Sequence, residues 1–369
     1  MAKGTYIGIA DKARKVKKLY FGVADKARKV KKVYFGVDGK ARLVYSAGPM
    51  LASNTNILGA RVVDASYNSN HAGMYSGSRI VYFLDKQLVK SERSLTGSTR
   101  GSAKPASNKT HLFFGGGSDS SSPNGSIFWV DAYNASLVRY DCGQLPPPQC
   151  YGIASASVGN FAIFFGGYNF TTIAEYRTYY DSSLVQRTST TYPRRREACG
   201  ITLPNHALFG GGYGGYSGSD YLSDVYRFDS SMVQTTISNL SYPESSKGGV
   251  SVGGNAIFAG GSRRAANIDA YNSSFVKVQV ADLPFVPELN LNKYVGCASL
   301  GDYALFMEGG KQNAGGKSKM SYFDSGLVRT DFQPITINNP YNTTFGFTGA
   351  SIGDKAIFNG YNEDLVFTS

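Results

Sequence analysis

From about residue 80 to the C-terminus one hydrophobic pattern recurs, a short apolar strand that contains phenylalanine and ends in or near glycine. Its matched phenylalanines are 45 to 52 residues apart: Phe113, Phe164, Phe209, Phe258, Phe306 and Phe358. An interval of this size is the length of one four-stranded blade of a β-propeller. The pattern therefore predicts an all-β fold built from repeated blades.

A polar turn alternates with this strand. It consists of an aromatic or apolar residue, Asp or Asn, two further residues, an apolar residue and valine, and its Asp or Asn positions are Asp85, Asn134, Asp181, Asp229, Asn272 and Asp324. The side-chain oxygen of Asp or Asn at the start of a tight turn accepts hydrogen bonds from backbone N–H groups. We therefore expect the turn to join the third and fourth strands of each blade. Stretches rich in Ser, Gly and Ala, such as residues 152–159, are expected to form the inner strands.

The order of these two features predicts how the ring closes. Six turns and six strands alternate strictly, beginning with the turn at Asp85 and ending with the strand at Phe358. This order favours six blades, with one blade made of two strands from each end of the chain. In the alternative, residues 50–79 and the tail 361–369 make a seventh blade.

The N-terminal region carries a different repeat. Three copies of a 14-residue unit occupy residues 6–45 and place Tyr6, Tyr20 and Tyr34 in register, each with a turn signal between two β-prone stretches. Each copy predicts a small hairpin, and an isolated hairpin is marginal in water. We expect the copies to stack on one another, to pair with other chains in a fibrous shaft (a homo-oligomer, with a trimer favoured), or to dock on another protein. The predicted organisation is a basic repeat at 1–46, a neck or partial blade at 47–79 and a propeller at 80–369.

The positive charge of the chain is concentrated in this repeat. Residues 1–46 contribute +10 of the formal net charge of +12, so an anionic partner is expected at the N-terminus. The candidate contacts are Lys15, Lys17, Lys18, Lys29, Lys31 and Lys32. Nucleic acid is the less favoured partner, because few aromatic residues interleave with the lysines, whereas an acidic docking surface or an anionic cell-wall polymer satisfies them equally.

Several classes of protein are disfavoured by what the sequence lacks. It has no apolar block typical of a secretory signal and no run that approaches the ~18 apolar residues of a membrane span, so the chain is expected to be soluble and made inside a cell. Cys142 and Cys150 flank a Pro-Pro-Pro turn where a disulfide is conceivable, but packed free thiols are favoured for these two and for Cys199 and Cys297. No metal or cofactor is expected.

A candidate binding surface lies in the loops between the second and third strands, which are long, dissimilar and rich in Gly, Ser and aromatic residues. Variable loops on a rigid ring commonly bind ligands. The candidate ligand-binding residues are tyrosines for stacking on sugars, polar partners for hydroxyls, and arginines for carboxylates or phosphates. They are Tyr213, Tyr216, Tyr221, Asp220, Asn313, Arg194, Arg195, Arg196, Arg263 and Arg264.

Enzyme chemistry is not expected, and no catalytic residue is proposed. The histidines His71, His111 and His206 have no metal-binding spacing, and the last two lie four residues before a strand-ending glycine, which indicates a packing role. No Gly-x-Ser-x-Gly or P-loop motif occurs. A carboxylate pair for glycan hydrolysis assembles in space and leaves no motif, so a glycan-active enzyme stays as the least favoured alternative.

The sequence resembles two known groups of proteins. The Gly-Gly pair with an aromatic strand in units of ~48 residues resembles kelch-type propellers over about 290 residues, although kelch blades usually carry a tryptophan and this chain has only Trp129. The tandem Lys-Ala-Arg-Lys-Val-Lys-Lys units resemble those of tail or other structural proteins of phages and prophages of Gram-positive bacteria. This second resemblance implies a virion tail protein, made in the bacterial cytoplasm, that contacts other tail or baseplate proteins through the repeats and a host-surface glycan or protein through the propeller. A structural protein that decorates the particle and binds nothing specific is the alternative.

Overall fold

A computed structural model describes residues 80–368 with short gaps, and the backbone of nine strands before residue 80. The gaps after residue 80 are 97–99, 101, 119–124, 170, 190–191, 216–219, 246, 263–265, 285–294, 309–316, 333–334, 337–346 and 361–362.

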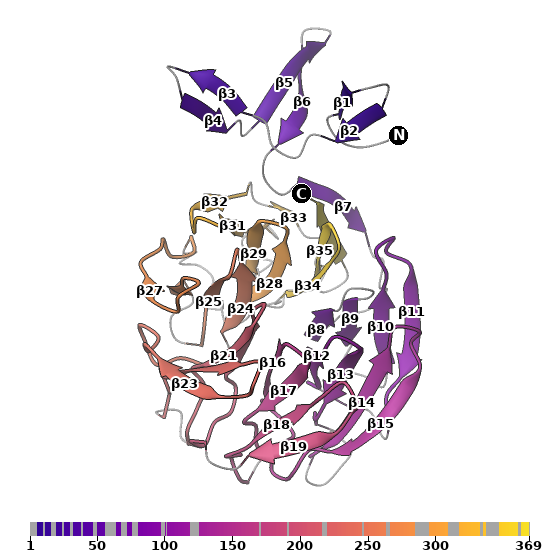
Figure 1. Ribbon diagram of the computed structural model, residues 1–369, viewed down its shortest axis with the longest axis vertical. Coiled ribbons are helices and arrows are strands. Elements are labelled where there is room, and N and C mark those ends of the chain that lie inside the picture. The colour runs from indigo at the N-terminus through magenta and orange to yellow at the C-terminus, as the bar shows by residue number, and fades with distance from the viewer. Residues whose placement is uncertain are drawn as a thin grey trace.

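The described residues form seven four-stranded antiparallel sheets, which are the blades of the ring in Figure 1. Blade 1 contains β8 (Asp64–Tyr67), β9 (Ala72–Tyr75), β10 (Ile80–Leu84) and β11 (Lys90–Ser94). Blade 2 contains β12 (Lys104–Ser107), β13 (His111–Gly115), β14 (Trp129–Asn134) and β15 (Arg139–Gln144). Blade 3 contains β16 (Ala154–Val158), β17 (Phe161–Phe165), β18 (Arg177–Tyr180) and β19 (Gln186–Ser189). Blade 4 contains β20 (Cys199–Thr202), β21 (His206–Gly210), β22 (Val225–Asp229) and β23 (Gln234–Ile237).

The remaining blades follow the same order from inner to outer strand. Blade 5 contains β24 (Gly248–Val252), β25 (Asn255–Ala259), β26 (Ile268–Tyr271) and β27 (Lys277–Val278). Blade 6 contains β28 (Val295–Leu300), β29 (Tyr303–Glu308), β31 (Met320–Asp324) and β32 (Arg329–Asp331). Blade 7 contains β34 (Thr348–Ile352), β35 (Lys355–Gly360), β36 (Glu363–Thr368) and β7 (Met50–Thr55). A short pair, β30 (Lys317–Ser318) with β33 (Ile335–Thr336), lies outside these sheets.

The inner strands close the ring. Each one contacts the inner strands of two neighbouring blades, in the cyclic order β8, β12, β16, β20, β24, β28 and β34, and β34 returns to β8. The predicted all-β propeller is therefore confirmed, but the favoured number of six blades is wrong. Residues 64–75 supply β8 and β9, so the turn at Asp85 belongs to a complete first blade. The predicted two-plus-two seam is also wrong, because blade 7 takes three strands from the C-terminus and only β7 from the N-terminal half.

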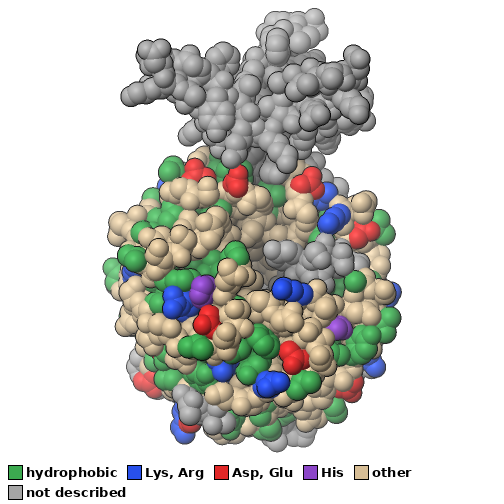
Figure 2. All heavy atoms as spheres, viewed as in Figure 1, with side chains coloured by type: hydrophobic (Ala, Val, Ile, Leu, Met, Phe, Trp, Pro, Cys, Tyr) green, Lys and Arg blue, Asp and Glu red, His purple; other side chains and the backbone are tan. Residues whose placement is uncertain are grey.

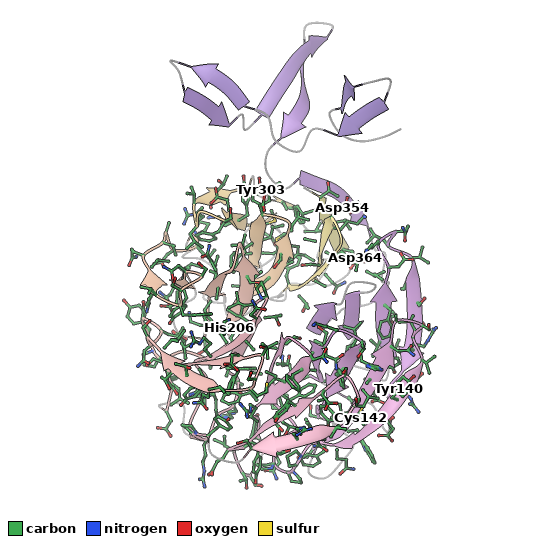
Figure 3. All side chains as sticks on the ribbon, in the orientation of Figure 1. Tyr140, Cys142, His206, Tyr303, Asp354 and Asp364 are labelled. Atoms are coloured by element: carbon green, nitrogen blue, oxygen red, sulfur yellow. The ribbon has the colours of Figure 1, made fainter. Side chains whose placement is uncertain are left out.

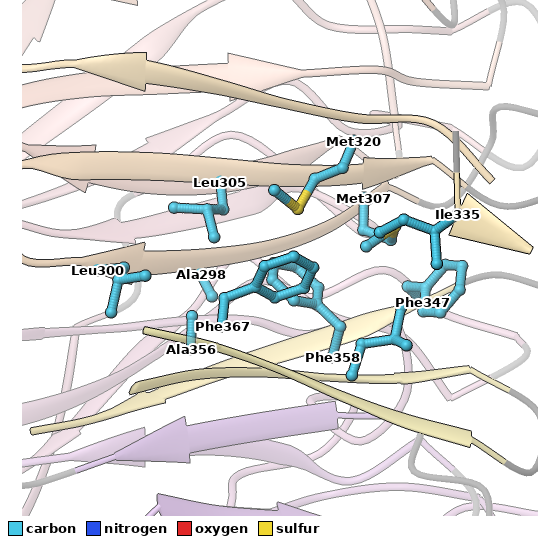
Figure 4. Packing of buried hydrophobic residues seen from close by; sticks show 11 residues of the cluster. Ala298, Leu300, Leu305, Met307, Met320, Ile335, Phe347, Ala356, Phe358 and Phe367 are labelled. Carbon is cyan, nitrogen blue, oxygen red and sulfur yellow. The ribbon is translucent and has the colours of Figure 1, made fainter. Parts of the chain in front are cut away.

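Burial of the second strands explains the hydrophobic pattern. All six matched phenylalanines have no exposed surface, and the core is a series of clusters that each join two neighbouring blades. In Figure 4, Phe358 and Phe367 of blade 7 pack against Leu305 and Met307 of blade 6. Because burial of apolar surface contributes about 25 cal/mol per Å², these interfaces stabilise the ring blade by blade.

The six predicted turns share one geometry. In each, the Asp or Asn Oδ1 atom accepts hydrogen bonds of 2.8–3.1 Å from the backbone N–H groups two and four residues later. The apolar residue before valine, Met232 for example, has a positive φ of 63°, which is uncommon for a large side chain. Met232 packs into the interface with blade 3, and this burial offsets the backbone strain.

The N-terminal copies form hairpins whose strands pair in the same register. They are β1 (Tyr6–Ile9) with β2 (Lys12–Lys15), β3 (Tyr20–Val23) with β4 (Lys26–Lys29), and β5 (Lys32–Val37) with β6 (Lys40–Ser46). Tyr6 pairs with Lys15 and Tyr20 with Lys29. None of these six strands joins a blade.

All four cysteines are free, as favoured from the sequence. Cys142 lies on the outer strand β15, as Figure 3 shows, whereas Cys150 is buried between blades. In the described part of the chain, no helix is long and apolar enough to span a membrane.

Candidate binding face at the mouth of the ring

The two ends of the ring are built from different connections. Because every blade is antiparallel, the loops from second to third strand and the linkers between blades emerge together, at what we call the mouth end. The connections from first to second and from third to fourth strand emerge at the other end, which we call the turn end. On the face drawn in Figure 2, acidic and basic side chains are interspersed and no patch of a single charge covers the described surface.

A central channel of about 690 Å³ is lined by the inner strands of blades 2 to 7. Its lining is rich in hydroxyl groups: Ser107, Ser155, Ser157, Thr202, Ser251, Ser299 and Ser351. These hydroxyls link neighbouring inner strands, as when Ser299 Oγ donates to Ser251 O at 2.8 Å. Burial raises the pKa of the channel thiol Cys199 to about 12, so this thiol is neutral. The hydroxyls therefore help to hold neighbouring blades together, and the lining also includes Lys104, Lys109 and Lys247.

Paired glycines hold a loop of the mouth end close to the linker beside it. Gly166 and Gly167 have φ values of 66° and 111°, and the Gly167 N–H donates to Arg195 O at 2.7 Å. A Cβ atom on Gly166 would overlap that same carbonyl oxygen, so only glycine lets the loop approach the linker this closely.

In blades 3, 4 and 5, the glycine pair places the next residue beside a residue of the linker that leads into the same blade. Tyr168 donates its backbone N–H to Tyr151 O at 2.8 Å, and Tyr213 donates to Arg196 O at 2.8 Å. In blade 5 the same backbone bond joins Ser262 to Ser245 at 3.1 Å. One backbone framework thus carries large side chains in blades 3 and 4 and small ones in blade 5.

The large side chains form a continuous half-buried row of Tyr151, Tyr168, Arg196, Tyr213 and Tyr221, which we call the tyrosine–arginine row. The rings of Tyr151 and Tyr168 are 5.1 Å apart. The guanidinium of Arg196 stacks between Tyr168 at 4.5 Å and Tyr213 at 4.8 Å. Tyr213 and Tyr221 are 4.4 Å apart, with their hydroxyls 2.9 Å from each other. Cation–π contacts and ring packing hold these side chains in place before any ligand arrives.

Glu197 adds a carboxylate to this row. Arg196 Nη1 donates to Glu197 Oε1 at 3.2 Å, and the Glu197 N–H donates to Gly152 O at 2.6 Å. Glu197 has a positive φ of 54°, a conformation that Gly152 adopts at the equivalent position of the linker into blade 3. A non-glycine residue in this region costs backbone energy and is often found at functional sites.

The row is uncharged apart from Arg196 and Glu197. Burial, and then the neighbouring Tyr151, raise the pKa of Tyr168 to about 12. Burial also raises the pKa of Tyr213. At neutral pH these phenols therefore keep their protons and can both donate and accept hydrogen bonds.

Three consecutive arginines of the sequence have three different environments. Arg196 belongs to the row, and Arg194 is exposed and pairs with Glu175 at 2.7 Å. Arg195 has no exposed surface; it forms an ion pair with Asp224 and donates to Gly211 O. Arg195 therefore does not offer its side chain to a ligand, and its prediction as a contact residue is corrected to a structural role.

Some of the other predicted site residues lie within the described part of the structure, and the rest lie outside it. Tyr213 and Tyr221 are brought together in the row, and Asp220 is exposed at its edge, where its backbone oxygen accepts from the Gly214 N–H at 2.8 Å. Tyr216, Arg263, Arg264 and Asn313 lie outside the described residues, as do Lys17, Lys18 and Lys31. Lys15, Lys29 and Lys32 lie on hairpin strands.

Three residues of the site were missed from the sequence: Tyr151, Tyr168 and Glu197. Tyr168 follows Gly166-Gly167 just as Tyr213 follows Gly211-Gly212, so the position after each glycine pair was the available signal. Tyr151 and Glu197 lie in linkers, and no local pattern marks them.

The described histidines have packing roles. The His206 ring, labelled in Figure 3, lies 4.6 Å from the Phe275 ring, and burial lowers its pKa. His111 packs against Tyr140 at 5.3 Å. Among the described residues, no group of three or more His, Cys, Asp or Glu is arranged to hold a metal ion.

Comparison with known proteins supports the fold. No protein-family model and no curated protein matches the chain. A selenomethionine form of virginiamycin B lyase from Staphylococcus aureus is similar with a TM-score of 0.59 and 11% identity, over 87% of this chain and 100% of that one. A catalytically inactive form of this lyase with quinupristin gives a TM-score of 0.59 and 12% identity over the same shares. YjhT gives 0.53 and 13%, over 78% of this chain and 97% of that one. At such identities the likeness shows the propeller fold alone.

Proposed function

We propose that this protein is a tail-associated receptor-binding protein of a phage or prophage, whose mouth end binds a glycan or protein on the host cell surface. The observation that carries the proposal is the tyrosine–arginine row. Blade 5 has the same backbone contact with only Ser245 and Ser262, so the fold does not need Arg196 and Tyr213 at the equivalent positions. Large, fixed aromatic side chains that the fold does not require are suited to binding.

The chemistry of the row fits a sugar. Half-exposed tyrosine rings pack against the C–H faces of a pyranose, while Arg196, Glu197 and the phenol groups supply hydrogen bonds to hydroxyls. The proposed role is binding without catalysis or cofactor, since Glu197 is paired with Arg196 and the pKa of Tyr168 is raised, which disfavours a phenolate nucleophile. The basic hairpins are proposed to anchor the protein to other tail or baseplate proteins in a homo-oligomer, and their resemblance to phage repeats supports this.

The natural variation between blades supplies the test. Tyr213→Ser and Arg196→Ser copy Ser262 and Ser245 of blade 5, so both variants should fold. We expect each to weaken binding to an arrayed host-surface glycan at least tenfold, while Tyr140→Ala, a change to an exposed tyrosine on β15, leaves binding unchanged.

The alternatives give different results in the same experiment. Binding that survives both serine variants would contradict the choice of site. Turnover of the polysaccharide by the purified protein would favour a glycan-active enzyme, and neither binding nor turnover would favour a purely structural decoration protein.

A further inference from the structure

One buried arginine lacks the partner that its counterparts have. Four cationic side chains of the described residues are more than nine-tenths buried, and three of them form ion pairs with carboxylates: Arg100 with Asp131 at 2.8 Å, Arg195 with Asp224, and Lys247 with Asp269 at 3.6 Å. Arg177, on β18 of blade 3, forms no ion pair with any described residue. A buried charge without a counter-ion is costly, so this exception calls for an explanation.

Arg177 also differs from the residues at the same position in other blades. The third strands can be aligned on the Asp or Asn of the turn that follows each of them. In blades 1, 2, 4, 5 and 6 the position of Arg177 is then occupied by Val81, Val130, Val225, Ile268 and Met320. All five are buried apolar side chains. The fold therefore prefers an apolar residue here, and blade 3 departs from that preference.

Aromatic rings surround the guanidinium of Arg177. Its central carbon lies 5.3 Å from the Tyr179 ring, 5.2 Å from Tyr192 and 4.6 Å from Phe228. Nη1 donates to Met232 O at 3.1 Å, and Nε has no hydrogen-bond partner. The rings and one carbonyl hold the cation, but they leave its positive charge uncompensated.

A cavity of about 450 Å³ lies on the other side of two of these residues, at the turn end between blades 3 and 4. We call it the turn-end groove. It is lined by Asn160, Phe161, Tyr179, Asp181, Ser182, Ser183, Arg187, Ser231 and Met232. Tyr179 and Met232 both line the groove and contact Arg177, so the buried charge lies directly behind its wall.

The groove itself combines rings, hydroxyls and a second arginine. Phe161 and Tyr179 meet edge to face at 5.3 Å. The Arg187 side chain is 61% exposed and only 4.0 Å from Asp181, whose Oδ1 atom already accepts the turn N–H groups of Ser183 and Val185. In the groove the Arg187 guanidinium lies near one carboxylate, which is engaged in its own turn. The buried charge of Arg177 adds to the positive potential there.

We propose that the turn-end groove binds a sugar that carries an anionic group, a phosphate or a carboxylate. The anion pairs with Arg187, whose planar fork suits both groups, and the charge of Arg177 strengthens this attraction from behind the wall. The sugar ring packs against Phe161 and Tyr179, while the amide of Asn160 and nearby serine hydroxyls bond to its hydroxyls. Because the groove lies at the turn end, this proposal stands independently of the mouth-end site.

Blade 6 provides the matched comparison. Tyr303 and Tyr322 repeat the aromatic pair of blade 3 at 5.3 Å and 84°. The positions of Arg177 and Arg187 are taken there by Met320 and Thr330. Arg177→Met and Arg187→Thr therefore convert blade 3 to a combination that the fold already accommodates.

The test is calorimetric titration of the full chain with glucose 1-phosphate, glucuronic acid and the neutral methyl glucoside. We expect one or both acidic sugars to bind and the glucoside to bind at least tenfold more weakly; the two acidic probes distinguish phosphate from carboxylate. Arg187→Thr should weaken binding at least tenfold and Arg177→Met about threefold, with unchanged circular dichroism. Lys86→Gln, an exposed charge on the turn of blade 1, should have no effect.

Five results would overturn the proposal. Four are equal binding of the neutral glucoside, full affinity in Arg187→Thr, binding of inorganic phosphate as tight as that of glucose 1-phosphate, and no binding of either acidic sugar at millimolar concentration. The mouth-end variant Arg196→Ser should retain full affinity for the acidic sugars, and its loss of that affinity would place the site at the wrong end of the ring.

Discussion

The mouth end and the turn end of the ring both repeat one backbone geometry from blade to blade, but they differ in whether the side chains repeat as well. At the turn end, six connections repeat one Asp or Asn turn with hydrogen bonds of nearly identical length. At the mouth end, the backbone contacts repeat but the side chains on them differ, from Tyr151 and Tyr168 to Ser245 and Ser262. A backbone that needs no particular side chain leaves these positions open to selection for binding.

The two ends also differ in what stabilises them. Linkers at the mouth end insert buried cations into the blades, where Arg100 and Lys247 meet carboxylates that have no exposed surface. Turns at the other end rely on exposed hydrogen bonds between side chain and backbone. We therefore expect single substitutions to cost much more stability at the mouth end.

The largest expected effect comes from Asp131→Ala. The Asp131 carboxylate bonds to Arg100 at 2.8 Å and to the Thr96 hydroxyl at 2.6 Å with no exposure to water. Its removal leaves Arg100 buried without a counter-ion, which typically costs about 3–5 kcal/mol, measured as a fall in the free energy of unfolding in urea.

The control for this variant is Asp141→Ala. Asp141 lies opposite Asp131 on the outer strand β15 and is exposed. It should lose about 1 kcal/mol or less, since it bonds only to its own turn at Gly143. Equal losses in the two variants would show that the buried pair adds nothing at this end of the ring.

Gly166→Ala should have the next largest effect, about 3 kcal/mol, because a left-handed φ and an overlap with the Arg195 carbonyl act together. Gly143→Ala separates the two causes. Gly143 also has a positive φ, of 77°, but nothing lies within 4 Å of its added Cβ, so we expect about 1 kcal/mol. Thermal unfolding followed by circular dichroism measures both, and similar values would show that the close approach is not what fixes the loop.

The sequence predicts the regular features of this fold well. The turns are specified by a local hydrogen-bonding residue, and the second strands by phenylalanines that must be buried. Six blades were favoured over the alternative of seven because β9 reads Ala72-Gly73-Met74-Tyr75 and lacks the matched phenylalanine. The seam was missed because β7 joins blade 7 by pairing over more than 300 residues, and nothing local marks such a partner.

The candidate site was predicted only in part, for a related reason. Arg194, Arg195 and Arg196 are indistinguishable in sequence, and only the backbone direction decides that one pairs at the surface, one is buried and one stacks on tyrosines. Arg177 was likewise invisible, because its significance lies in the apolar residues that occupy its position in other blades. Repeats aligned on a structure therefore reveal exceptions that a linear pattern does not.

The smallest effect should come from Asp324→Ala at the turn end. Asp324 Oδ1 accepts the N–H groups of Gly326 and Val328 at 2.9 and 3.0 Å and helps to hold Leu327 at a φ of 61°. Each partly exposed bond contributes modestly, so we expect a loss of about 1 kcal/mol in urea unfolding.

Asp324→Asn decides whether geometry or charge is responsible for that loss. Asn134 and Asn272 make the same two hydrogen bonds at 3.0 Å in blades 2 and 5, so the asparagine variant should keep nearly full stability. If alanine and asparagine were equally destabilising, the carboxylate charge rather than the shared turn geometry would hold this end of the ring. The turn end would then depend on residue-specific electrostatics as the mouth end does, and the contrast between the two ends would fail.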